Sequence, residues 1–184
     1  SDSGIKGGSG SAMGVEKGLR SSQIIFENKL PLIQLIESAG ANLLRQTDMF
    51  IKGGRSFANL AKMSAKGIPT IGVVHGSSTA GGAYQTGLSD YIIVVKKRSK
   101  IFLAGPPLLK ASLGEIATDE EIGGADIHFA VSGLAEYMAN DDAHAIEIAR
   151  DVMKKIGWND DFVSTQKDDY KAVSYTHLTL PTNT

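Results

Sequence analysis

The most informative stretch of the chain is His75-Gly76-Ser77-Ser78-Thr79-Ala80-Gly81-Gly82-Ala83-Tyr84, which directly follows the apolar run Ile71-Gly72-Val73-Val74. An apolar run that ends in a glycine-rich turn predicts a buried strand leading into a helix. Glycines at a helix start let an anion or an oxyanion approach the free backbone N–H groups closely. We therefore expect main-chain amides here to stabilise negative charge. Close packing of strand against helix is the alternative interpretation of the same glycines.

Composition restricts the kinds of function that the chain can have. Its 184 residues, 42% of them hydrophobic, suit one domain or one domain plus a tail. The net charge of −1, with both signs interspersed, predicts neither a nucleic-acid nor a membrane partner. The absence of cysteine excludes disulfides, thiolate metal sites and a cysteine nucleophile. His128 and His144 lack the spacing of metal ligands, so no metal site is expected.

Two features of the sequence bear on the cellular location of the protein. No apolar stretch approaches the roughly 20 residues of a membrane span, and the first residues lack the features of a signal peptide. We therefore expect a cytoplasmic protein, or a mitochondrial-matrix protein if the source is eukaryotic. The chain begins without methionine, which suggests a fragment with a missing N-terminus.

Hydrophobic periodicity predicts helices that alternate with strands. We expect helices over about 15–28 and 56–66, a short one after Gly81, and a long one that the cluster Asn140-Asp141-Asp142 caps and Gly157 ends. Strands are expected over 32–37, 70–74, 91–95 and 100–103. This alternation predicts an α/β fold of right-handed βαβ units with a largely parallel, buried sheet.

The last residues differ in character from the rest. Residues 173–184 show no helical amphipathicity and look like a translated read-through, so we expect a non-native tail there. Residues 159–172 are expected to form a linker toward a missing C-terminal domain.

Several stretches, taken in their order, resemble the carboxyltransferase β-subunits of biotin-dependent acyl-CoA carboxylases, a branch of the crotonase superfamily. The resemblance covers residues 1 to about 158, leans toward the methylcrotonoyl-CoA branch, and departs at Ala39, where the family usually has glycine. The matching stretches are Asp2-Ser3-Gly4-Ile5-Lys6-Gly7-Gly8, Leu30-Pro31-Leu32-Ile33, Glu37-Ser38-Ala39-Gly40-Ala41, Gly67-Ile68-Pro69, the glycine-rich run from Gly76 to Tyr84, Ile101-Phe102-Leu103-Ala104-Gly105-Pro106-Pro107-Leu108, Leu113-Gly114-Glu115, Gly123-Gly124-Ala125-Asp126-Ile127-His128 and Ser132-Gly133.

The resemblance implies a crotonase-like (ClpP/crotonase) ββα superhelix, with residues 1–158 as a partial N-terminal carboxyltransferase domain that binds acyl-CoA. A similar C-terminal domain would receive carboxybiotin, and the active site would lie at a subunit interface, so an isolated half is not expected to turn over. The implied partners are a biotin carboxylase or biotin carrier subunit and other β-subunits in a homo-oligomer. The implied cofactor is biotin on the partner subunit.

The resemblance also implies roles for particular residues. Carboxyl transfer needs a proton removed α or γ to the thioester, and paired amides stabilise the resulting enolate oxygen. Biotin, once decarboxylated, can take the proton, so no side-chain base is required. The residues expected at the oxyanion sites are Gly81, Gly82, Gly40 and Ala41, and those expected to bind the CoA substrate are Lys6, Gly7, Gly8, Ala80, Tyr84, Gly105 and Pro106.

Each of these assignments has a plainer alternative. Lys6-Gly7-Gly8 suits an anion-binding nest or a solvated turn, and Tyr84 suits a pantetheine contact or simple packing. Gly105-Pro106-Pro107 redirects the chain and is expected to shape the pocket wall.

Two other functions stay open. A different crotonase-fold enzyme, such as an enoyl-CoA hydratase, needs carboxylates over the pocket, for which Glu115 is the nearby candidate. A non-catalytic CoA-binding module needs none. A hydrolase is disfavoured, because Gly76-Ser77-Ser78-Thr79-Ala80 does not match the Gly-x-Ser-x-Gly elbow.

Overall fold

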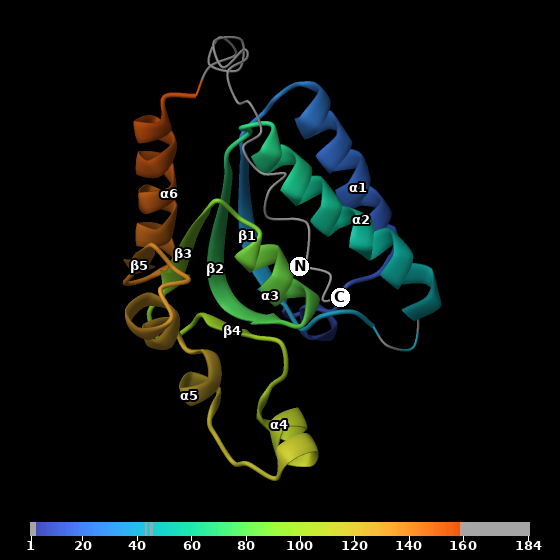
Figure 1. The fold of residues 1–184 in the computed structure, drawn as a ribbon, viewed down its shortest axis with the longest axis vertical. Helices are drawn as coiled ribbons and strands as arrows, with labels where there is room; N and C mark the ends of the chain where they lie inside the picture. The colour runs from blue at the N-terminus through green and yellow to red at the C-terminus, as the bar shows by residue number, and fades with distance from the viewer. Residues whose placement is uncertain (1–2, 43, 45, 159–184) are drawn as a thin grey trace, which may run out of the picture.

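The computed structural model describes residues 3–42, 44 and 46–158, in which helices and strands alternate (Figure 1). In chain order the elements are the 3-10 turn η1 (Lys6–Gly8), α1 (Ala12–Glu27), β1 (Leu32–Ser38), α2 (Gln46–Ala65), β2 (Thr70–Thr79), α3 (Gly81–Gly87), β3 (Tyr91–Val95), β4 (Lys100–Phe102), α4 (Pro106–Leu113), α5 (Asp119–Gly123), the π-helical turn η3 (Ile127–Val131), β5 (Tyr137–Ala139) and α6 (Asp142–Ile156).

The strands form one parallel sheet, as the alternation of elements predicts. Its order is β1-β2-β3-β5, and β4 pairs with the second half of β2. The first half of β2 lies between β1 and β3, so that Val73 is opposite both Leu35 and Ile93. Since consecutive parallel strands need a crossover, α2 connects β1 to β2 and α3 connects β2 to β3.

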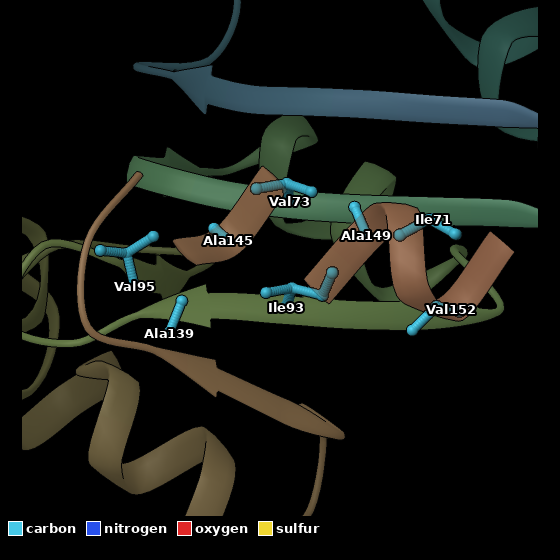
Figure 2. Packing of buried hydrophobic residues seen from close by; sticks show 8 residues of the cluster. All are labelled: Ile71, Val73, Ile93, Val95, Ala139, Ala145, Ala149 and Val152. Atoms are coloured by element: carbon cyan, nitrogen blue, oxygen red, sulfur yellow. The ribbon is translucent and has the colours of Figure 1, made fainter. Parts of the chain in front are cut away.

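Helices cover the two faces of the sheet. The pair α1 and α2 lies on one side and α6 on the other (Figure 1). Toward α6, buried Ile71, Val73, Ile93 and Val95 pack against a stripe of small side chains (Figure 2). That stripe is Ala145, Ala149 and Val152. The long amphipathic helix expected over this segment is thus confirmed, including its N-cap Asp141 and its left-handed C-cap Gly157.

One side chain, Ser99, forms hydrogen bonds at the point along β2 where its pairing changes from β3 to β4. Val74 is the last β2 residue paired with β3, and Ser77 is the first paired with β4. Between these pairs, the buried Ser99 hydroxyl donates to the Val74 carbonyl at 2.5 Å and accepts from the Val95 N–H at 2.5 Å. The start of β4 is therefore tied to both neighbouring strands.

Several element boundaries differ from the expectation. Helix α2 begins at Gln46 and not near residue 56, because the low helix propensity of Gly53-Gly54 does not end a helix that packs along α1. Strand β2 runs on to Thr79, because β4 supplies a partner for its second half. The elements α4, α5, η3 and β5 were not predicted, since each is eight residues or fewer and lacks a clear period.

None of the helices within the described ranges is long and apolar enough to cross a membrane. The expected linker over 159–172 and the expected tail over 173–184 lie outside the described residues and remain predictions.

Candidate functional site: a cavity at the start of helix α3

The turn from β2 into α3 is built around a strained alanine. Ala80, the N-cap of α3, has φ 52° and ψ −113°, a conformation that L-residues rarely adopt. Its N–H donates to the Phe102 carbonyl at 3.1 Å, which ties the turn to the end of β4. Such strain costs on the order of 1–3 kcal/mol and is typical of functional sites, where the surrounding structure enforces it.

The turn exposes backbone donors. Ala83 and Tyr84 donate their N–H groups to the Ala80 carbonyl at 3.1 and 3.4 Å. The two preceding N–H groups, of Gly81 and Gly82, find no acceptor among the described residues, and no side chain caps the helix. The first turn of α3 therefore presents unsatisfied amides, as the sequence predicts.

The two glycines of this turn differ in their surroundings. A β-carbon on Gly82 would lie 3.1 Å from both the Ser38 β-carbon and the Ser78 hydroxyl, so Gly82 is needed for packing. A β-carbon on Gly81 would meet only the edge of the Phe57 ring, at an ordinary 3.5 Å. Gly81 is thus the glycine of this turn that has open space beside its α-carbon.

Buried hydroxyls hold α3 on the sheet. The Thr86 hydroxyl donates to the Gly82 carbonyl at 3.1 Å and lies 3.0 Å from the Ser78 hydroxyl of β2. Because Thr86 uses its one hydrogen on Gly82, the Ser78 hydroxyl is the donor between the two. This chain fixes the direction in which the first turn of α3 points.

A second loop, after β1, meets the turn. Gly40 has φ 89°, and a β-carbon on it would lie 3.3 Å from that of Ala80. The Gly40 carbonyl accepts from the Gly10 N–H at 2.9 Å, and the Gly40 N–H donates to the Ser38 hydroxyl at 3.1 Å. Of the expected pair Gly40 and Ala41, the Ala41 amide is the one without an acceptor among the described residues.

The two loops share a cavity of about 340 Å3, within the size range of small-molecule sites. Its walls are apolar side chains and bare backbone from α1, α2 and the two loops. The lining residues are Val15, Ala39, Gly40, Ala41, Met49, Phe50, Gly53, Gly54, Phe57, Ala80 and Gly81. Gly40, Ala41, Ala80 and Gly81, four of the expected site residues, are thus brought together, while Gly82 lies buried behind the wall.

The remaining expected residues lie elsewhere. The Tyr84 ring is exposed and packs against the Phe57 ring, with 5.9 Å between the ring centroids and 58° between the planes, and Tyr84 is not among the described lining residues. Gly105 caps α4 and Pro106 occupies its first turn, and this helix extends away from the sheet (Figure 1). Neither Gly105 nor Pro106 lines the cavity.

The loop Lys6–Gly8 lies beside the end of β1. Gly7 and Gly8 both have positive φ, and Gly8 is buried against the backbone of Glu37 and Ser38. The Gly8 N–H donates to the Ile5 carbonyl at 3.0 Å, as in an ordinary tight turn. This bond leaves Gly8 without a free amide for an anion.

Sequence reasoning missed the α2 side of the cavity. Met49, Phe50 and the glycine pair Gly53 and Gly54 precede the helix start expected near residue 56. A signal was present, because Met49, Phe57 and Leu60 follow a helical period that continues across the two glycines.

Among the described residues, the lining of the cavity contains no acid and no base. Glu115 lies on the exposed segment between α4 and α5. Among the described residues there is no cluster of ligands for a metal ion. A larger groove of about 390 Å3 between α1 and α2 contains Arg20, Arg55 and Lys62 but none of the expected site residues. The apolar cavity is therefore the candidate site, and its polar chemistry is that of main-chain N–H groups.

Comparison with solved structures defines the class to which this fold belongs. The β subunit of geranyl-CoA carboxylase from P. aeruginosa is 55% identical, with a TM-score of 0.80 over 86% of this chain and 30% of that chain. Transcarboxylase 12S, described as a hexamer with hydrolysed methylmalonyl-coenzyme A bound, is 31% identical, with a TM-score of 0.77 over 83% of this chain and 30% of that chain. The fold is the crotonase-like fold of the carboxyltransferases.

Sequence comparison places the chain in its family. Residues 1–178 match the carboxyl transferase domain, and the chain belongs to that family. A probable biotin-dependent acyl-coenzyme A carboxylase beta2 subunit of Mycobacterium tuberculosis is 51% identical over 84% of this chain and 29% of the relative. A probable mitochondrial methylcrotonoyl-CoA carboxylase beta chain of Drosophila melanogaster is 50% identical over 84% of this chain and 27% of the relative. The chain therefore spans under a third of the length of these relatives.

Proposed function

We propose that this chain forms the acyl-CoA side of a biotin-dependent carboxyltransferase, with the thioester carbonyl in the apolar cavity. The observation that carries the proposal is the convergence of two loops on one cavity, each with an amide that has no acceptor in the described structure. These amides belong to Gly81 and Ala41. Family membership and the names of the relatives support the same reaction class.

The amides act on developing charge. When a proton leaves the carbon α or γ to the thioester, the carbonyl oxygen becomes an enolate oxygen that accepts from N–H donors more strongly than the ground state does. Loss of one such donor typically costs about 3 kcal/mol of transition-state stabilisation. The strained turn at Ala80 holds the Gly81 N–H in place beforehand, so that no reorganisation is needed during the reaction.

The cavity fits a reaction in which the base comes from outside this chain. No ionisable residue is found in the described part of its lining, so no side chain there can take the substrate proton. Biotin, when bound, supplies the carboxyl group and a site for that proton. The apolar walls exclude water from the enolate, which strengthens the amide contacts and suppresses reprotonation.

The implied partners follow from the same relatives. We propose a biotin carboxylase or biotin carrier subunit as donor and a homo-oligomer as the working assembly, as in the transcarboxylase 12S hexamer. We also propose a cytoplasmic location, or the mitochondrial matrix for a eukaryotic source, because relatives include mitochondrial proteins.

Acyl-CoA binding to the 184-residue chain tests the proposal by isothermal titration. Gly81→Ala should weaken binding by about tenfold, because its methyl group lies beside the donating N–H. Its β-carbon makes only the ordinary Phe57 contact, so the melting temperature should not fall. The matched control is Gly87→Ala at the other end of α3, where nothing lies within 4 Å. Equal affinities for the two variants would refute the assignment of Gly81.

A further inference from the structure

The π-helical turn η3 has an unusual backbone and carries a histidine, His128. A bond of 2.8 Å from the Ser132 N–H to the Ile127 carbonyl closes the turn. Turns of this kind are rare and are frequent at functional sites. His128 does not belong to the described lining of the cavity, so any part that it plays in the site must act through other residues.

Both ring nitrogens of His128 have hydrogen-bond partners. Nε2 lies 2.7 Å from the Ile101 carbonyl oxygen. Because a carbonyl oxygen only accepts, Nε2 carries the proton of the neutral ring and donates it to Ile101. Nδ1 of that tautomer is an acceptor, and the Ser132 hydroxyl lies nearer to it than to the His128 carbonyl, at 3.1 against 3.4 Å. These two contacts fix the orientation of the ring.

The Ile101 carbonyl lies on the edge of β4 that faces away from β2. Successive carbonyls of a strand point to opposite sides, and the next one, of Phe102, accepts from the Ala80 N–H of the β2–α3 turn at 3.1 Å. A β-carbon on Gly123 would lie 2.1 Å from the Ile101 carbonyl oxygen, so only glycine lets the end of α5 come this close. His128 thus supplies a donor at the outer edge of β4.

Two consecutive carbonyls of β4 therefore connect His128 to the candidate site. The first accepts from His128, and the second accepts from Ala80, which is held at the strained φ of 52°. Gly81, whose amide faces the site in the proposed function, directly follows Ala80. A shift at the end of β4 would weaken the hydrogen bond of Ala80 and release the turn.

We propose that His128 is a positioning residue for the reaction. Through the end of β4 it holds the turn at Ala80, and with it the Gly81 N–H, in the orientation that meets an oxyanion. The inference rests on the proposed function, because that function assigns the oxyanion to Gly81.

The test replaces His128 in the 184-residue chain by residues that keep or lose its donor. In His128→Gln the side-chain amide can take the place of Nε2–H, whereas the amide of His128→Asn is one methylene shorter and His128→Leu has no donor. The control is His144→Leu on α6, a partly exposed histidine that also bonds to the backbone, through the Asn140 N–H at 3.2 Å.

The first measurement is hydrogen exchange of the Ala80 amide by NMR. It is compared with exchange of the buried mid-helix amide of Ala149 in α6, which reports global unfolding. Loss of one hydrogen bond corresponds to about tenfold in a local opening equilibrium, so Ala80 should exchange about tenfold faster in His128→Leu and His128→Asn. Its rate should be unchanged in His128→Gln and in His144→Leu.

The second measurement is isothermal titration with methylcrotonoyl-CoA. Affinity should fall about threefold or more in His128→Leu and His128→Asn, and change by less than about twofold in His128→Gln and His144→Leu. The pair His128→Gln and His128→Asn decides the question even where the leucine variant does not fold.

Three results would overturn the inference. They are equal exchange rates and affinities in His128→Gln and His128→Asn, equal losses in His144→Leu, and faster Ala80 exchange with unchanged affinity, which would show a purely structural hydrogen bond. If the unmodified chain binds no acyl-CoA, the proposed function fails. That result is distinct, because the exchange rates would still distinguish His128→Gln from His128→Asn.

Discussion

Gly40 and Ala80 are in contact at the point where the two site loops meet. A β-carbon on Gly40 would lie 3.3 Å from that of Ala80, and both residues have positive φ, 89° and 52°. Helix α2 and strand β2 separate the two loops along the chain. Each loop thus places a residue with positive φ, a conformation that L-residues rarely adopt, against the other. The geometry of the candidate site depends on this contact, because Ala41 and Gly81 directly follow the two residues.

The contact predicts that Gly40→Ala is destabilising. Alanine is strained at φ 89°, and its methyl group would press on Ala80, so the free energy of unfolding should fall by about 1–3 kcal/mol. Urea unfolding followed by circular dichroism measures it.

The companion variant Ala80→Gly separates the two causes. It removes both the facing methyl group and the strain at φ 52°, so on its own it should raise the free energy of unfolding by about 1 kcal/mol. In the double variant the loss from Gly40→Ala should shrink. Strict additivity of the two changes would mean that the residues do not interact.

Ser99→Ala tests the hydrogen bonds by which the residue before β4 links strands β2 and β3. The substitution leaves the Val74 carbonyl and the Val95 N–H buried without their hydrogen bonds, so the free energy of unfolding should fall by about 2–3 kcal/mol. Chemical denaturation provides the measurement. The control is Ser112→Ala on α4, an exposed helix, where a change below about 0.5 kcal/mol is expected. Similar losses of the free energy of unfolding at both positions would show that the buried Ser99 hydroxyl contributes no more to stability than an exposed one.

The start of α5 predicts a dependence of stability on pH. The backbone N–H of Thr118, and then its hydroxyl, donate to the Glu121 carboxylate at 2.8 and 2.9 Å and lower the pKa of Glu121 below its ordinary 4.5. A lowered carboxyl pKa in the folded state adds stability above the ordinary pKa, and this contribution is lost as pH falls through the folded-state pKa.

Glu121→Gln should therefore melt at a lower temperature than the unmodified chain at neutral pH, and the difference should shrink as pH falls below 4.5 and through the lower folded-state pKa of Glu121. Melting curves between pH 3 and 7 measure it, with Glu115→Gln on the exposed segment before α5 as the control. A difference that stays constant with pH would show that the carboxylate charge has no part in the cap.

Strands β1, β3, β4 and the first half of β2 were predictable because they are short apolar runs with clear ends, whereas β5 was not predicted. The stretches at Ile71 and Tyr91 lie in the buried centre, where hydrophobicity alone identifies a strand. Helix α6 was equally clear, since its cap, its small-residue stripe and its final glycine agree with one another. Local sequence signals suffice to predict an element where the hydrophobic pattern, the capping residue and the terminal glycine all indicate that element.

Contacts between distant segments were harder to predict. The extension of β2 to Thr79 depends on its pairing with β4, which no local pattern reveals. The start of α2 depends on packing against α1, which outweighs the weak helix propensity at Gly53. The capping box at Thr118 and Glu121 matches the sequence pattern Thr-x-x-Glu. The five-residue helix that it begins is, however, too short to show a helical hydrophobic period.

The candidate site was predictable in part for the same reason. Glycine marks the backbone positions that approach a ligand, so Gly40 and Gly81 could be named from their motifs. The pair Gly105-Pro106 signals a chain break equally well, and this break begins helix α4. Turn chemistry identifies where the chain bends and leaves open what faces the bend.

As far as the structure describes it, the lining of the cavity has no ionisable side chain, and its free donors belong to the main chain. Main-chain amides do not titrate in the physiological range, and no single side-chain exchange other than proline deletes them. Such a site is inherited with the path of the backbone and not with a set of residue identities. Under the proposed function, homologues that keep this path can exchange every side chain around it and diverge in the acyl group that they accept, while the means of stabilising the enolate stays the same.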